Sequence, residues 1–269
     1  MINNQKMEFM PVSSIASQFM EDIEHIYGKT NSIKLDFPVD AIDAYLATRI
    51  GKLGKGKLLV IATRNAKLRE EFCIRTALHL SRAQGKSVAI ATGSNSFVFF
   101  IRKLLDHLAD IPSDSGVYDG QLGAAEVQRL ASALLTLCSS NLLIYPSTMI
   151  GLDDLRVAAG KLLHQTEGIE MVLVDTAQYL RDKNHHLVDV KQSIVRLKAL
   201  AEELNVPVIA TYQLDTTIEN HQTTLTRLEL REVETMAALT DDFILMSSAG
   251  GQILFSLPKV LKKESAKQP

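Results

Sequence analysis

Two polar residues stand just after buried apolar runs in the middle of the chain, and their types suit phosphate chemistry. Asp175 follows the run 171–174, and Gln213 comes shortly after the run 206–211. In phosphate-transferring enzymes, an acid at the end of a buried strand helps to hold Mg²⁺, and a neutral amide on the next strand orients a water or senses the terminal phosphate. The pair therefore indicates a nucleotide site with Asp175 as a metal ligand. The alternative, that Asp175 begins a loop and Gln213 is a surface amide, stays open on this pattern alone.

The elements around these two residues are expected to bring them together. Uninterrupted apolar runs are typical of strands that are buried on both faces of a parallel sheet. Between the two runs, one apolar face recurs at helical spacing, formed by Val190, Ile194, Leu197, Leu200, Ala201 and Leu204. Ligands of open α/β sheets bind at the carboxyl ends of the strands, so Asp175 and Gln213 share a crevice if their strands are neighbours.

The same alternation of strand and helix continues along the chain. We expect further strands at 57–63, 87–92 and 142–145, helices at 40–53, 96–108, 124–137 and 152–165, and a closing hairpin at 243–246 and 253–255. This alternation predicts an α/β fold: a doubly wound, mostly parallel sheet with helices on both faces.

Composition narrows the class of protein without naming a partner. The chain has 269 residues, 46% of them hydrophobic, and a formal net charge of −2, which excludes a globally basic nucleic-acid binder but allows a local basic stripe. Cys73 and Cys138 lack metal-ligand spacing and are expected to be reduced thiols. The longest apolar run, 97–101, is too short to cross a bilayer. We therefore expect a cytoplasmic protein with no membrane partner.

The stretch VDTAQYL…SIVRLKALAEELNVPVIATYQLD resembles the second half of the RecA-like motor domain of DnaB-like replicative DNA helicases. Asp175 and Gln178 match the family's Asp-Tyr-Leu-Gln-Leu strand end. Downstream, LELREVETMAALTDDFILM resembles the family's Asp-Leu-Arg-Glu segment, with Glu229 in place of Asp. The similarity covers nearly all of residues 13–256.

The resemblance implies a three-part organisation and a process. The RecA-like helicase-type domain is expected at 35–258, after an extension and linker helix at 1–34 and before a disordered tail at 259–269. We expect no counterpart of the family's separate N-terminal domain. The process implied is DNA replication.

The family's phosphate-binding loop is altered here. Its glycines let backbone N–H groups face the phosphates, its Lys reaches the β- and γ-phosphates, and its Thr hydroxyl binds Mg²⁺. In the text ATRNAKLREEF, Leu68 falls at the family's Gly, Arg69 at its Lys and Glu70 at its Thr, while Arg64 matches an Arg of the loop. Leu68 disfavours positive φ, and Glu70 places a carboxylate where phosphate oxygens should lie. The resemblance thus implies a degenerate nucleotide site.

The family's water-activating Glu is also replaced, because Ser94 stands at its position. A hydroxyl without a base partner does not accept the proton of the attacking water usefully at neutral pH. We therefore assign no catalytic residue and regard Asp175 and Gln213 as remnants. ATP and Mg²⁺ are expected only if the chain is an active ATPase after all.

A basic loop follows the Asp175 strand. Arg181, Lys183, His185 and His186 occupy the place of the family loop that faces the central channel and contacts single-stranded DNA. The alternative is a solvated loop, since only Tyr179 lies nearby to stack on bases.

An amphipathic helix is expected at 13–27, with an apolar stripe of Ile15, Phe19, Ile23 and Ile26. In the family a helix at this position docks on the neighbouring subunit. The alternative is that the stripe packs on its own domain.

Three functions remain open. The first is a non-catalytic paralogue that assembles with itself or with a replicative helicase and regulates or loads it. The second is a divergent ATP-dependent helicase that uses Arg69 and Asp175 in an unusual site. The third is a single-stranded DNA-binding module.

Overall fold

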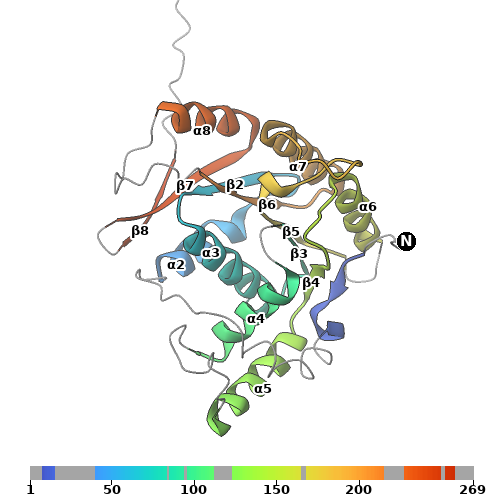
Figure 1. The fold of residues 1–269 in the computed structure, drawn as a ribbon, viewed down its shortest axis with the longest axis vertical. Coiled ribbons are helices and arrows are strands. Elements are labelled where there is room, and N and C mark those ends of the chain that lie inside the picture. The colour runs from blue at the N-terminus through green and yellow to red at the C-terminus, as the bar shows by residue number, and fades with distance from the viewer. Residues whose placement is uncertain are drawn as a thin grey trace, which may run out of the picture.

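The computed structural model describes residues 8–15, 40–83, 85–93, 96–111, 123–164, 168–214, 227–249 and 252–257. Within these ranges the chain folds around one eight-stranded sheet in the order β1-β4-β3-β5-β6-β2-β7-β8 (Figure 1). The strands are β1 (Met10–Pro11), β2 (Leu58–Thr63), β3 (Val88–Thr92), β4 (Leu142–Tyr145), β5 (Met171–Asp175), β6 (Val208–Gln213), β7 (Asp242–Ala249) and β8 (Gln252–Ser256).

The six inner strands are all parallel, and the two edge strands are antiparallel to their neighbours. β7 and β8 form the predicted closing hairpin. β6 begins at Val208, two residues later than predicted. Pro207 has no N–H to donate to the sheet, although its carbonyl accepts from Val172 N at 3.1 Å.

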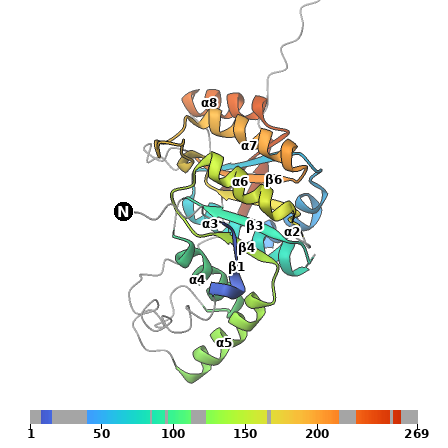
Figure 2. The same cartoon turned by 90° about the vertical axis from the view of Figure 1, so that its right-hand side faces the viewer.

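Helices cover both faces of the sheet (Figures 1 and 2). They are α2 (Asp40–Thr48), α3 (Ala66–Leu78), α4 (Phe97–Leu108), α5 (Ala124–Cys138), α6 (Leu152–Leu163), α7 (Val190–Leu204) and α8 (Arg227–Leu239). Alternate residues of β2 join opposite cores: Leu59 and Ile61 pack with α2, α3, α4 and α5, whereas Leu58 and Val60 pack with α6, α7 and α8. The predicted α/β class is confirmed.

The helix α7 illustrates why the local sequence folds as predicted. Asp189 caps it by accepting hydrogen bonds from Lys191 N at 3.0 Å and Gln192 N at 3.4 Å. Asn205 ends it in the left-handed region, at φ 51°. The helix therefore has the predicted bounds and aligns β5 and β6 side by side.

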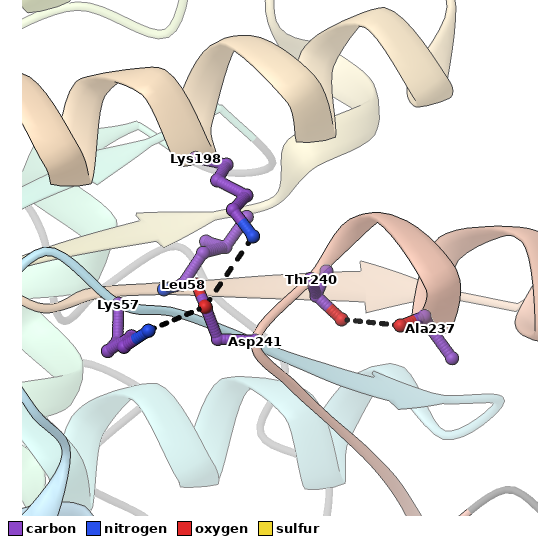
Figure 3. A network of polar contacts seen from close by, with 6 residues as sticks. All are labelled: Lys57, Leu58, Lys198, Ala237, Thr240 and Asp241. Atoms are coloured by element: carbon purple, nitrogen blue, oxygen red, sulfur yellow. Dashed lines mark hydrogen bonds and ion pairs between the residues drawn. The ribbon is translucent and has the colours of Figure 1, made fainter.

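The amino ends of the central strands are joined by a polar network around Asp241 (Figure 3). One carboxylate oxygen accepts from Lys57 Nζ at 3.1 Å and from Lys198 Nζ at 3.5 Å, and the other accepts from Leu58 N at 3.0 Å. The network connects β2, α7 and the start of β7. Both lysine side chains remain in contact with solvent, at 54% exposed for Lys57 and 34% for Lys198.

The N-terminal segment 8–15 belongs to the domain. β1 pairs with β4, Phe9 packs edge-on against the Tyr145 ring at 5.4 Å, and Val12 and Ile15 are buried in the core. Ile15 therefore does not form part of an exposed docking stripe, contrary to its sequence assignment, because its own sheet edge covers it. The rest of that stripe lies outside the described residues: Phe19, Ile23 and Ile26.

Three smaller expectations concern the cysteines, membrane crossing and the tail. Cys73 is buried and Cys138 is partly buried, and both are free thiols. None of the helices in the described ranges is long and apolar enough to cross a bilayer. The expected tail at 259–269 lies outside those ranges.

Candidate functional site

Asp175 and Gln213 do lie at neighbouring strand ends. β5 pairs with β6 through Val174 and Ala210, and β6 pairs with β2 through Gln213 and Thr63. The carboxyl ends of β5, β6 and β2 thus lie side by side, at the position of the ligand crevice in open α/β sheets. The predicted adjacency of the two strands is confirmed.

Asp175 is engaged by an arginine from α3. Arg69 Nη1 donates to Asp175 Oδ1 at 2.5 Å, and the side chains are only 7% and 2% exposed. Thr211 Oγ1 donates to the same oxygen at 2.8 Å. A buried carboxylate thus lies between a cation from the helix and a hydroxyl from β6, so α3, β5 and β6 are joined at this point.

Only Arg64 and Asn65 connect β2 to α3. Asn65 Oδ1 accepts from Lys67 N at 3.0 Å and from Leu68 N at 3.1 Å, as an N-cap residue does. The first-turn N–H groups that a helix N-terminus can offer to an anion are therefore in part taken by the chain's own side chain. Residues 66–70 are already helical.

Arg64 pairs with a carboxylate from the far end of the sequence. Its Nε donates to Glu229 Oε1 at 2.7 Å and its Nη2 donates to Oε2 at 2.5 Å, a bidentate pair in which Glu229 is 7% exposed. The hydrogen bonds that Arg64 donates to Glu229 raise the pKa of Arg64, although burial opposes them. The two arginines of the crevice thus each make an ion pair with a carboxylate.

The amide of Gln213 is also used within the chain. Its Nε2 donates to the Arg64 carbonyl oxygen at 2.5 Å. Gln178 extends the sheet beside it: Gln178 Oε1 accepts from Gln213 N at 2.8 Å, and Gln178 Nε2 donates to Gln213 O at 2.7 Å. These bonds fix the end of β6 against the β2–α3 junction.

Several polar atoms in the crevice remain without hydrogen-bond partners among the described residues. They are Arg69 Nε, Glu70 Oε1, Thr176 Oγ1 and Gln213 Oε1. Burial raises the pKa of Glu70, Lys103 lowers it and the Asp175 carboxylate raises it, with a net upward shift. Glu70 therefore holds its proton more tightly than a carboxyl in water does.

Comparison with known proteins identifies the family. A protein-family model described as the DnaB-like helicase C terminal domain matches residues 43–246. The chain belongs to this family.

Curated relatives are distant. The replicative DNA helicase DnaB of Geobacillus stearothermophilus is 25% identical over 218 residues, which is 80% of this chain and 47% of that protein. DnaB of Synechocystis is 25% identical over 247 residues, or 91% of this chain and 28% of that protein. This DnaB-like chain thus spans about half the length of the first relative and less of the second.

Solved structures agree on the fold. A DnaB-like replicative helicase, described with its interactions with primase, matches with a TM-score of 0.64 at 18% identity, over 88% of this chain and 56% of that one. A second solved structure, described as an ATPase domain, matches with a TM-score of 0.62 at 17% identity, over 87% of this chain and 83% of that one. The eight-stranded arrangement is therefore that of a DnaB-type ATPase domain.

The basic loop predicted to contact DNA is a closed turn. Asp182 Oδ1 accepts from Asn184 N at 2.8 Å and from His186 N at 3.0 Å, and Arg181 Nη1 donates to the His185 carbonyl oxygen at 2.7 Å. These backbone hydrogen bonds lower the pKa of Asp182, although burial opposes them. Arg181 therefore supports the turn, which leaves Lys183, His185 and His186 exposed on its outside.

No group of three or more His, Cys, Asp or Glu residues suited to a metal ion occurs within the described ranges. Asp175, the predicted metal ligand, faces Arg69 there. Ser94 lies outside those ranges. The residue before it, Gly93, has no room for a side chain, since an added Cβ would come within 2.9 Å of Tyr179 Cβ.

Sequence reasoning missed the partners that close the crevice. Glu229 was noted only as a replacement for an Asp, and Thr211 only as part of a strand. Asn65 carried a local signal, because Asn is a preferred N-cap residue just before a helix. The pairing of Arg64 with Glu229, 165 residues apart, had no local signal.

Proposed function

We propose that this DnaB-like domain does not run an ATPase cycle and acts by assembling with itself or with a replicative helicase, which it regulates or loads. The observation that carries the first half is the buried Arg69–Asp175 pair. The carboxylate in the family's metal-binding position is engaged by an arginine of the same chain.

The β2–α3 junction supports the same proposal. A phosphate cradle needs a loop whose N–H groups point at the ligand, usually rich in glycine. Here two residues separate strand from helix, and Asn65 accepts from Lys67 N and Leu68 N. Glu70 adds a carboxyl whose pKa is raised by burial and by the nearby Asp175 carboxylate. The residues present do not fit a magnesium–nucleotide complex.

Assembly is supported by the identity of the chain's relatives and by exposed apolar side chains. The relatives found are replicative helicases. On α5, Val127 is 50% exposed and Leu135 is 74% exposed, eight residues apart and so on one side of the helix. Phe19, Ile23 and Ile26 of the predicted linker stripe remain candidates for the same contact.

The test of assembly leaves residues 8–15 intact, because Phe9, Val12 and Ile15 are core residues. Light scattering is measured on the full chain, alone and with the replicative helicase of the same cell. We expect an oligomer or a mixed complex that Phe19→Asp/Ile23→Asp disrupts without lowering the melting temperature.

A matched control carries the same added charge on the other side of the predicted helix: Ser17→Asp/His25→Asp should assemble as the parent does. A parent chain that stays monomeric at high concentration and ignores the helicase refutes assembly, whatever the nucleotide result.

The active-ATPase alternative requires that Arg69 release Asp175 when nucleotide binds. Saturable Mg·ATP binding by the unmodified chain would favour that alternative. Turnover that Asp175→Ala abolishes would favour it as well.

Single-stranded DNA binding is a second candidate, favoured by the surface around the 181–187 turn. Tyr179, Leu187 and Met149 are 40%, 57% and 49% exposed. Leu187 pairs with Arg181, which in turn pairs with Gly151, and Tyr179 and Met149 lie two residues before Arg181 and Gly151. Exposed aromatic and basic side chains together suit single strands.

Such binding should be weak, insensitive to sequence and reduced by salt. We expect Lys183→Ala/His186→Ala to weaken the binding of a fluorescent oligonucleotide, and Lys191→Ala, on α7, to leave it unchanged. Equal affinity of the parent and the double variant would exclude the turn as the contact.

A further inference from the structure

The Arg69 guanidinium is enclosed at a point where three elements meet. Arg69 lies on α3, Asp175 at the end of β5, and Thr211 on β6. Asp175 Oδ1 accepts from both of the other two, at 2.5 Å and 2.8 Å. The Arg69 side chain is 7% exposed, so its charge is largely removed from water.

Oxygen atoms of neighbouring residues lie close to this ion pair. The Glu70 carboxyl interacts with the charges of Lys103, Asp175 and Arg69, and its Oε1 is buried without a hydrogen-bond partner. The hydroxyl of Thr176, next to Asp175 in the chain, is also buried and lacks a partner. Carboxylates and hydroxyls are hard ligands of the kind that bind small divalent cations.

We propose that the Arg69 guanidinium takes the place of a bound metal ion. As a cation built into the chain, it holds α3, β5 and β6 in one arrangement without a ligand. The inference rests on the proposed function but concerns a different property: what holds α3, β5 and β6 together. A buried carboxylate needs a compensating charge, and in this chain a covalently attached guanidinium supplies it.

Two consequences follow from this arrangement. The domain needs no nucleotide or metal to order its crevice, so added Mg²⁺ should leave the stability of the parent chain unchanged. Truncating Arg69 should leave Asp175 buried without its cation and open a space that a free cation can fill. A soluble cation should then restore the stability that the Arg69 side chain provided.

The experiment is chemical rescue of the full chain carrying Arg69→Ala. Its melting temperature should fall by roughly 6–20 °C, as expected when a buried ion pair is broken in a domain of this size. Guanidinium at low millimolar concentration, and separately Mn²⁺ or Mg²⁺, should recover about half of the loss or more. The parent chain, with its cation in place, should not respond to either addition.

Arg75 provides a matched control on the same helix. It pairs with Glu71 and Asp43, and its side chain is 13% exposed. Arg75→Ala should lower the melting temperature, and guanidinium should not restore it, because its partner Asp43 is 53% exposed and can be solvated by water instead. In Arg69→Ala/Asp175→Ala, the rescue by either cation should disappear.

Three results overturn the inference: Arg69→Ala melts as the parent does, no cation rescues it, or the double variant is rescued equally. If Arg69→Ala does not fold alone, soluble yield after refolding with and without guanidinium replaces the melt, and equal yields refute the inference. These measurements contain no ATP. Nucleotide binding by the parent chain would refute the proposed function and leave the rescue result intact.

Discussion

The two ends of the central strands are both tied by ion pairs, but the pairs differ in their contact with water. At the amino ends, Asp241 accepts from Lys57 and Lys198, whose side chains are half and one-third exposed. At the carboxyl ends, Arg69 and Asp175 are both buried. The two clusters have the same chemistry in very different surroundings.

The two clusters therefore differ in how easily their ion pairs open to water. An exposed lysine exchanges a carboxylate for water at little cost, so the amino-end network is worth little and salt weakens it. A desolvated pair does not exchange in this way, because each partner alone would be a buried charge. The carboxyl end, where open α/β sheets in general bind ligands, is thus the end at which this chain has a fixed internal partner.

The largest expected effect compares the two ends directly. Arg69→Met should lower the free energy of unfolding by about 3–5 kcal/mol, since it leaves Asp175 buried without its cation. Lys57→Met should lower it by no more than about 1 kcal/mol. Urea unfolding of both variants measures the two losses, and equal losses would remove the distinction between the ends.

The next effect concerns Gln178, whose amide makes two hydrogen bonds with the backbone of Gln213. Gln178→Leu should lower the free energy of unfolding by about 2 kcal/mol, because it leaves two partly buried backbone groups unpaired. Gln192→Leu, on the exposed side of α7, serves as the control and should change it by less than about 0.5 kcal/mol. Similar losses in the two variants would show that the end of β6 is not fixed by Gln178.

Glu70 should make the folded domain less stable as pH rises. Its folded pKa is raised above the usual 4.5, so the folded state binds its proton more tightly than the unfolded state does. Stability then falls as pH rises from about 4.5 to the raised folded pKa and is constant above it. Glu70→Gln should remove this slope and stabilise the domain at pH 7. Parallel pH profiles of the two proteins would contradict the prediction.

Asp241 should show the opposite sign and the smallest effect. Burial raises its pKa, but the Leu58 and Lys57 hydrogen bonds outweigh this and hold the pKa below 3.8. Its contribution is therefore present above about 3.8 and is lost as pH falls through the lowered folded pKa. Asp241→Asn should cost roughly 0.5–1 kcal/mol at pH 7 and lose this acid dependence. A cost that does not shrink in high salt would show that the network is more buried than its exposure indicates.

The fold was predictable because local pattern and topology rules agree. The apolar face of 190–204 and the runs before Asp175 and Gln213 determine strand, helix and strand, and parallel βαβ connections leave few arrangements. The ends of strands were harder to predict where a single residue cannot donate a hydrogen bond to the sheet, as at Pro207. The N-terminal segment was misplaced because a two-residue strand carries no periodicity, so its pairing with β4 depends on tertiary contacts.

The sequence predicts residues for the candidate site but not their contacts. The resemblance to the family predicts Leu68, Arg69 and Glu70 at the position of its phosphate loop. The sequence does not reveal that Arg69 reaches Asp175, 106 positions away, or that Arg181 closes its own turn. Both depend on side-chain direction, which spacing along the chain does not determine across separate elements.

The most direct test of the central claim is a calorimetric titration of the unmodified chain with Mg·ATP, followed by a phosphate-release assay on the same sample. With Arg69 paired to Asp175 and Asn65 capping α3, we predict no saturable binding up to millimolar nucleotide and no turnover. Saturable binding at micromolar concentration, with phosphate release that Asp175→Ala abolishes, would contradict the account.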